Sequence, residues 1–119
     1  MPETLHGVSV HFVPADGPVL DSERAATDLI GSLWGTDVEM VVVPAQCVGD
    51  DFFRLRTGVA GAIAQKFVNY RKQLVIIGDI SRHVEASTAL RDFVFESNRR
   101  KDLWFLADEA ELHARLRNA

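Results

Sequence analysis

Apolar and polar positions follow one another in blocks that predict alternating strands and helices. Runs of mainly apolar residues at 8–13, 38–43, 74–79 and 103–106 are typical of strands, and the middle two suit strands buried on both faces of a sheet. Between them apolar residues recur every three or four positions, which predicts helices beginning near Ser22, Asp51, Ser87 and Asp108. The order β-α-β-α-β-α-β-α favours an α/β fold whose mostly parallel sheet of four or five strands has helices packed on it.

The segment 51–70 has the strongest helical period. Its apolar side chains recur from Phe52 to Phe67 at the spacing of one helix face, so we expect one long amphipathic helix. Gly58 and Gly61 lie inside it, where each costs up to about 1 kcal/mol relative to Ala. We interpret both as allowing close approach to the sheet. The segment 80–86 that follows the third strand is expected to be a loop.

Composition fits one folded domain over residues 1–119. Hydrophobic residues make up 47% and charged residues 25%, close to the average for globular domains. No apolar run approaches the roughly 20 residues of a membrane span, and the first residues do not form a secretory signal. We therefore expect a cytoplasmic protein without a membrane partner. The single cysteine, Cys47, forms neither an internal disulfide nor a cysteine zinc site and is interpreted as an inert thiol.

Charge is unevenly distributed along the chain. Residues 1–50 contain one cation and eight acids, whereas the remainder contains twelve cations and nine acids. This imbalance predicts a surface with two electrostatically different faces. Because the isoelectric point is about 5.5, we expect no nucleic-acid partner.

Polar residues that directly follow the predicted strands are the first candidate site. In parallel sheets ligands bind beyond the carboxyl ends of the strands. The alternative is that the aspartates, Asp108 included, cap helices, although Asp79 is too far from the next predicted helix for that role. The histidines lack the spacing of metal ligands, so we expect no metal and no cofactor. The candidate ligand or partner surface consists of Asp50, Asp51, Arg54, Thr57, Asp79, Ser81 and His83.

A second polar group lies near the ends of two predicted helices. We favour structural roles for these residues. The asparagines would end helices, and Tyr70 would tether the turn into the third strand. The carboxylates of Asp92 and Glu96, one helical turn apart, would pair with Lys66 or Arg71. The alternative is a partner surface. The group consists of Lys66, Asn69, Tyr70, Asp92, Glu96 and Asn98. Trp34 and Trp104 are expected in the core or at a dimer interface.

Two stretches match more residues than periodicity requires. They read FFRLRTG at 52–58 and DFVFESN at 92–98, with Ile77-Gly78-Asp79 between them, and they resemble a bacterial family known as domain of unknown function 4180 over nearly the whole chain. The element order is also similar to the STAS fold of anti-sigma-factor antagonists. In that fold a phosphorylatable Ser or Thr opens the helix after a central strand. Here residues 49–53 contain no hydroxyl, and Thr57 is the nearest candidate.

These observations favour a non-catalytic regulatory or interaction module that acts on a protein partner or on a second copy. Its expected surface is the start of the long helix together with the segment 81–85. One alternative is a domain that binds a nucleotide or anionic metabolite at the strand ends, with Arg82 as an additional cation. A small enzyme that uses the carboxylates around Asp79, or Cys47, is the third hypothesis.

Overall fold

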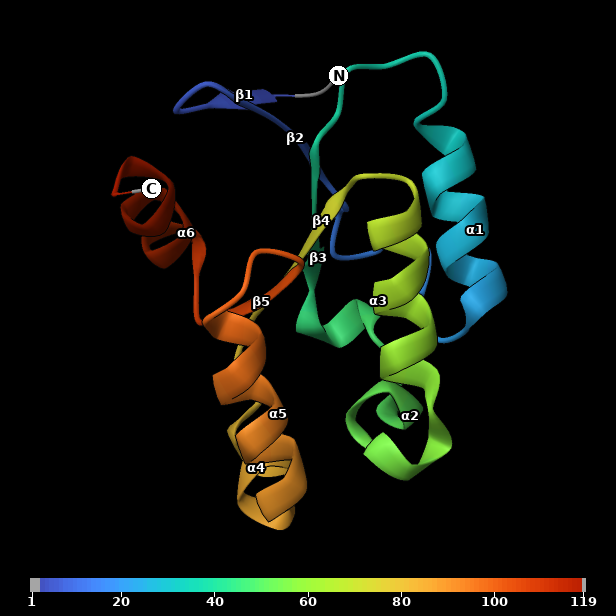
Figure 1. Ribbon diagram of the computed structural model, residues 1–119, viewed down its shortest axis with the longest axis vertical. Helices are drawn as coiled ribbons and strands as arrows, with labels where there is room; N and C mark the ends of the chain where they lie inside the picture. Colours follow the sequence, from blue (N-terminus) through green and yellow to red (C-terminus); the bar gives the residue numbers. More distant parts are fainter. Residues whose placement is uncertain (1–2, 119) are drawn as a thin grey trace.

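In the computed structural model, which describes residues 3–118, the four predicted strands lie in one sheet with a fifth at its edge (Figure 1). The spatial order is the chain order, β1-β2-β3-β4-β5. β1 is antiparallel to β2, and every later pair is parallel. The strands are β1 (Glu3–Leu5), β2 (Val8–Phe12), β3 (Met40–Pro44), β4 (Gln73–Ile77) and β5 (Leu103–Leu106).

β1 was not predicted because its residues carry little strand signal. Two of its three residues are polar and exposed. A tight turn joins it to β2, in which both His6 and Gly7 take positive φ angles, of 50° and 84°. That geometry matches the right-handed twist of a hairpin. The edge of the sheet is therefore set by a two-residue turn and not by a run of apolar residues.

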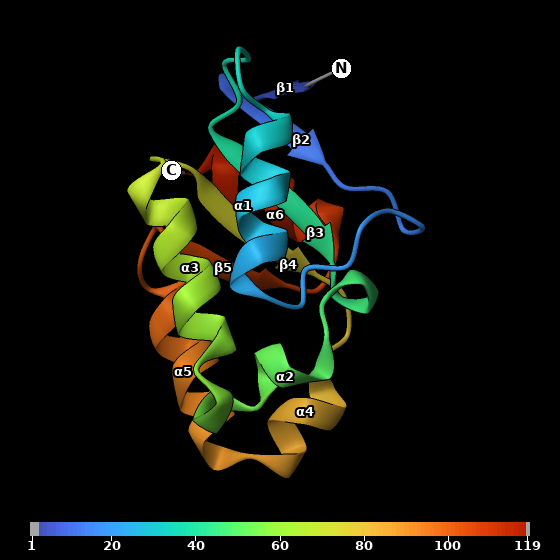
Figure 2. The same cartoon turned by 90° about the vertical axis from the view of Figure 1, so that its right-hand side faces the viewer.

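Three long helices cover one face of the sheet, and one covers the other (Figures 1 and 2). Right-handed crossovers that always advance in the same direction must place their helices on one side. The shared face holds α1 (Glu23–Ser32), α3 (Val59–Asn69) and α5 (Thr88–Asn98), whose side chains pack on the odd-numbered residues of β3. α6 (Glu109–Arg117) covers the opposite face through Leu112 and Leu116.

The long helix expected over 51–70 is wrong. The segment divides into α2 (Asp50–Phe53), a 3₁₀ turn η2 (Leu55–Thr57) and α3. Gly58 joins the last two with φ +76°, a left-handed conformation that cannot continue a helix. A Cβ at Gly58 or at Gly61 would meet no atom within 4 Å, so neither glycine serves close packing as we had interpreted.

The segment 80–86 is also not the expected loop. It forms a short helix, α4 (Ser81–Ala86), directly ahead of α5. A 3₁₀ turn, η1 (Ala45–Cys47), similarly follows β3. The predicted helix starts are confirmed where a side chain caps the helix, because Ser22, Ser87 and Asp108 each accept a bond from the backbone N–H three residues later.

The two tryptophans have opposite environments. Trp104 is buried and donates its indole N–H to the Arg100 carbonyl at 2.7 Å, as expected for a core residue. Trp34 is 87% exposed, so a core position for it is wrong. Within residues 3–118 no helix is long and apolar enough to cross a membrane.

Candidate functional site

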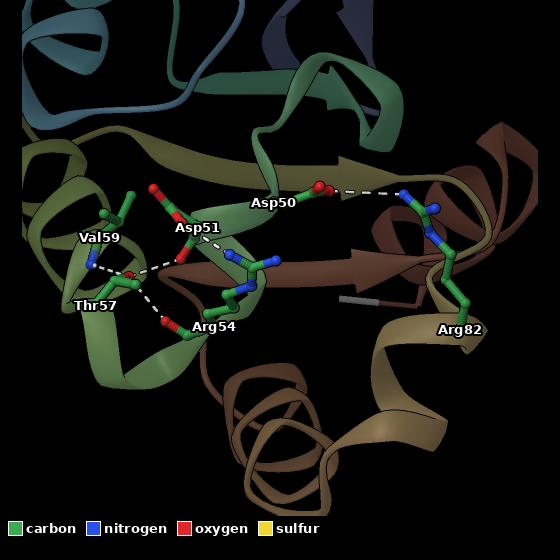
Figure 3. Close-up of polar contacts among 6 residues, drawn as sticks. All are labelled: Asp50, Asp51, Arg54, Thr57, Val59 and Arg82. Carbon is green, nitrogen blue, oxygen red and sulfur yellow. Dashed lines mark hydrogen bonds and ion pairs between the residues drawn. The ribbon is translucent and has the colours of Figure 1, made fainter.

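Most of the predicted surface residues gather where β3 and β4 end (Figure 3). α2 follows β3 through η1, and α4 follows β4, so the first turns of two short helices lie at the same end of the sheet. An ion pair joins them, with the Asp50 Oδ1 atom 3.7 Å from the Arg82 Nη2 atom. Both side chains are largely exposed, so this pair contributes little to the stability of the fold.

Thr57 closes the break between α2 and α3. Its hydroxyl lies 2.7 Å from the Asp51 carbonyl and 2.8 Å from the Arg54 carbonyl and shares one proton between them. The same oxygen accepts a bond from the Val59 backbone N–H at 3.2 Å (Figure 3). Thr57 is thus a connector and does not lie inside a helix as predicted. The Asp51 carboxylate also pairs with Arg54 at 3.6 Å.

The Asp79 carboxylate bonds to a residue two positions later in the chain. Its Oδ1 atom accepts the Ser81 backbone N–H at 2.9 Å, and bonds from the Ser81 side chain and backbone lower the pKa of Asp79. Asp79 lies one residue before Ile80, the N-cap of α4, whereas Asp108 is itself the N-cap of α6 and accepts the Glu111 N–H. Asp50 and Asp51 instead lie in the first turn of α2, after its N-cap Gly49. In the described chain, no three His, Cys, Asp or Glu side chains gather as a metal site would require.

His83 stacks on Phe53, with ring centroids 4.2 Å apart and ring planes 12° from parallel. Its pKa is lowered first by burial and then by Arg82 and Arg54, against an opposing effect of Asp50. The stacked rings divide two cavities. One, of about 310 Å³, lies among Gln46, Gly78, Asp79 and Arg82, and the other, of about 580 Å³, lies against Arg54, Arg56, Ser87 and Ala89.

The second predicted group does not form one cluster. Lys66 pairs with Glu23 of α1 at 3.3 Å, and Glu96 pairs with Arg99 at 3.5 Å within its own helical turn. The expected pairing of Lys66 with the acids of α5 is therefore wrong. Asp92 is exposed on α5.

The two asparagines have different roles. Asn69 is the last residue of α3, and its side chain accepts a bond from Gln65 at 2.8 Å. Asn98 ends α5, as predicted, and then reaches across to the backbone of β5. Both side chains form hydrogen bonds within the fold.

The family resemblance is confirmed by comparison with family models. The model described as a domain of unknown function (DUF4180) matches residues 5–116. The chain belongs to this family. Comparison with curated proteins and with solved structures gave no significant match. The match spans both ends of the sheet, so the surfaces described above and the one that follows all lie within the DUF4180 domain.

The feature that sequence reasoning missed is at the opposite end of this DUF4180 domain. There Trp34 and Tyr70 bound an open cleft of about 380 Å³, which we call the aromatic cleft. Tyr70 is 51% exposed. The remaining lining comes from the last turn of α1, the loop that follows it and the turn before β4: Ile30, Leu33, Gly35, Thr36 and Lys72. The available signal was a Trp among polar residues, directly after the last apolar position of a helix.

Cys47, His6 and His113 line none of the cavities described above. Cys47 is buried, and its Sγ atom lies 3.2 Å from the Ala15 carbonyl, in keeping with an inert thiol. His6, in the β1–β2 turn, meets His113 of α6 with the Nε2 and Nδ1 atoms 3.3 Å apart. Only the fold brings these two together, since they are 107 positions apart in the sequence.

Proposed function

We propose that the chain is a non-catalytic regulatory or interaction module that acts through protein contacts at the aromatic cleft. The observation that carries this proposal is the exposure of Trp34, at 87%, in the wall of an apolar cleft that it shares with Tyr70. Tryptophan and tyrosine are the residues most enriched among those that dominate binding energy at protein interfaces. Large aromatic side chains left in water beside a cleft are therefore expected to be covered by a partner.

The energy available at this surface is sufficient for specific association. Burying one aromatic side chain removes about 150–250 Å² from water, which at about 25 cal/mol per Å² gives a gross gain of about 4–6 kcal/mol. Part of that gain is lost to ordering and to the entropy of association. Two such side chains on one wall supply the apolar core of an interface, with Lys72 and Thr36 at its polar edge.

The topology supports an interaction role more than a ligand site in the crevice around Asp79, directly at the carboxyl ends of the strands. Ligands of open parallel sheets bind where the strand order reverses and neighbouring helices diverge to opposite faces. In this sheet the order β1-β2-β3-β4-β5 has no reversal. The carboxylate expected to lead such a site, Asp79, is already bonded to Ser81. The STAS-like assignment and the regulatory role belong to this proposal and rest on the likeness of element order.

Photo-cross-linking in the native cells tests the proposal directly. A photoreactive phenylalanine analogue at Thr36, in the cleft, is compared with the same analogue at Phe95, an exposed aromatic position on α5 outside the cleft. We expect an adduct of defined mass from position 36 that is absent from position 95. An adduct of twice the chain mass indicates self-association, and any other mass indicates a different protein.

Cleft variants provide the control. Trp34→Ala and Tyr70→Ala are expected to abolish the adduct from position 36, whereas Lys101→Ala, a change at an exposed residue outside the cleft, leaves it intact. If position 36 gives no adduct beyond that of position 95, or if the adduct survives both cleft substitutions, the interaction proposal is wrong.

A further inference from the structure

The cavity beyond the Phe53–His83 stack carries a second inference. Its lining residues come from the α2–η2 segment and from the junction of α4 with α5. These elements lie at the end of the sheet opposite the aromatic cleft. We propose that this cavity, the arginine cavity, binds a small molecule that bears a phosphate or carboxylate group. Its lining residues are Phe53, Arg54, Leu55, Arg56, His83, Ala86, Ser87 and Ala89.

Two guanidinium groups supply the recognition of an oxyanion. Arg54 and Arg56 both line the cavity, and none of its lining residues is acidic. Arg54 contacts Asp51 through one nitrogen at 3.6 Å, and both side chains are exposed, so most of its N–H donors remain available. Arg56 forms no ion pair within the chain that the structure describes. Guanidinium groups bind phosphate and carboxylate through two parallel hydrogen bonds.

A hydroxyl adds a third donor to the cavity. The Ser87 Oγ atom accepts the Leu90 backbone N–H at 3.1 Å, which uses a lone pair and leaves the O–H proton free to donate. The cavity thus offers donors from η2 on one side and from the start of α5 on the other. A ligand held by both would bridge two segments that follow different strands.

The rest of the lining suits the remainder of a small organic molecule. Leu55, Ala86 and Ala89 are apolar, and the stacked rings of Phe53 and His83 present a flat aromatic wall. A volume of about 580 Å³ is within the usual range of small-molecule sites, which is about 300–1,000 Å³. The cavity between the rings and Asp79 is about half as large, and its one acidic residue, Asp79, offsets the charge of Arg82, so it is less suited to an anion.

The electrostatic environment of His83 supports the same ligand class. Burial is the largest cause of the lowered pKa of His83, and the field of the cations Arg82 and Arg54 lowers it further, against an opposing effect of Asp50. An oxyanion bound beside the ring would offset that field. The imidazole would then gain a proton more readily and could donate to the ligand.

The test is an NMR titration of the labelled full chain with inorganic phosphate, pyrophosphate and citrate, each compared with sodium chloride at equal ionic strength. We expect saturable shifts at the amides of Arg56, Ser87 and Ala89, and a rise in the pKa of His83 when the ligand is bound. Tighter binding of pyrophosphate than of citrate would identify the ligand class as phosphates, and the reverse order as carboxylates.

Two variants and a control decide the assignment. Arg56→Gln is expected to weaken binding about tenfold or more, because a charge-assisted bidentate contact is lost. Ala89→Glu, at an exposed position in the first turn of α5, places a carboxylate in the cavity and should abolish binding while the helix is retained. Arg117→Gln removes the same charge from α6 and should leave the affinity unchanged.

Shifts that do not saturate, that sodium chloride reproduces, or that Arg56→Gln and Arg117→Gln change equally would overturn the proposal. The aromatic cleft shares no residue with the arginine cavity. Failure of this titration therefore leaves the cross-linking result at Thr36 unaffected, and the two proposals can be judged separately.

Discussion

Asn98 shows how one side chain protects the edge of the sheet. β5 is an edge strand, so one side of its backbone has no neighbouring strand. The Asn98 side chain accepts the Phe105 N–H at 2.7 Å and donates to the Phe105 carbonyl at 3.1 Å, as a neighbouring strand would. Arg115 in turn donates to the Asn98 backbone carbonyl and lies over the Trp104 ring at 4.1 Å. Unpaired edges promote aggregation, so this arrangement has a clear physical purpose.

Substitution of Asn98 is expected to lower the free energy of unfolding more than the loss of one small side chain usually does. Asn98→Ala leaves a backbone donor and a backbone acceptor without partners at a partly buried position, so we expect a loss of about 2–3 kcal/mol in the free energy of unfolding. Asn69→Ala is the matched control, because that side chain bonds only to an exposed Gln65 and should change stability by less than about 0.5 kcal/mol. Chemical denaturation measures both, and equal losses would contradict the role given to Asn98.

At the scale of elements, Gly58 and Gly61 have opposite roles although they lie three residues apart. Gly58 is left-handed, with φ +76°, and ends η2 so that α3 can begin in a new direction. Gly61 is an ordinary helical residue of α3, is exposed, and has no neighbour within 4 Å of a built Cβ atom. Neither glycine is therefore needed for close packing: Gly58 is required by a left-handed turn, and Gly61 occupies an open helical position.

These roles predict stability changes of opposite sign. Gly58→Ala forces a side chain into the left-handed region and should destabilise the fold by about 1–2 kcal/mol. Gly61→Ala improves the helix propensity of an open position and should stabilise it by about 0.5–1 kcal/mol. Thermal and chemical denaturation of the two variants side by side is the measurement. Destabilisation by Gly61→Ala would mean that something packs against α3 at that point.

Sequence reasoning located the elements whose signal is local. The apolar runs that became β3, β4 and β5 are buried on both faces, and side-chain caps such as Ser22 and Ser87 bond within three residues. It missed β1, whose pairing depends on a turn, and it missed the break at Gly58, because apolar residues continue at helical spacing across it. In both cases the deciding feature is a positive φ angle, which hydrophobic periodicity does not report.

At the scale of the whole molecule, one candidate site was predictable from the sequence and the other was not. The rim at the strand ends was predictable, because parallel topology brings segments that follow neighbouring strands together, and the Asp50–Arg82 pair lies there. The aromatic cleft was not, because a Trp next to a helix is more often buried, and its exposure depends on how α1 meets the turn before β4. The His6–His113 contact and the Phe53–His83 stack likewise arise only from the tertiary fold.

The two histidines with depressed pKa values predict how the stability of the whole fold depends on pH. Burial is the first cause of the lowered pKa at both His11 and His83, from an ordinary value of 6.5. Between that value and the folded-state pKa, the unfolded chain binds more protons than the folded one. The free energy of unfolding should therefore fall as the pH drops below about 6.5 and level off once the folded histidines are also protonated.

Chemical denaturation at pH values between 8 and 5 measures this slope, and the window lies above the range in which Asp79 titrates. Because the pKa of Asp79 is lowered from 3.8, its contribution to the free energy of unfolding is fully present once the pH is well above 3.8. That contribution is therefore constant throughout the experiment. The double variant His11→Gln/His83→Gln should show a flatter dependence than the unmodified chain. An unchanged slope would mean that neither ring is held neutral by the fold, and the field that Arg54 and Arg82 impose at the arginine cavity would be weaker than inferred.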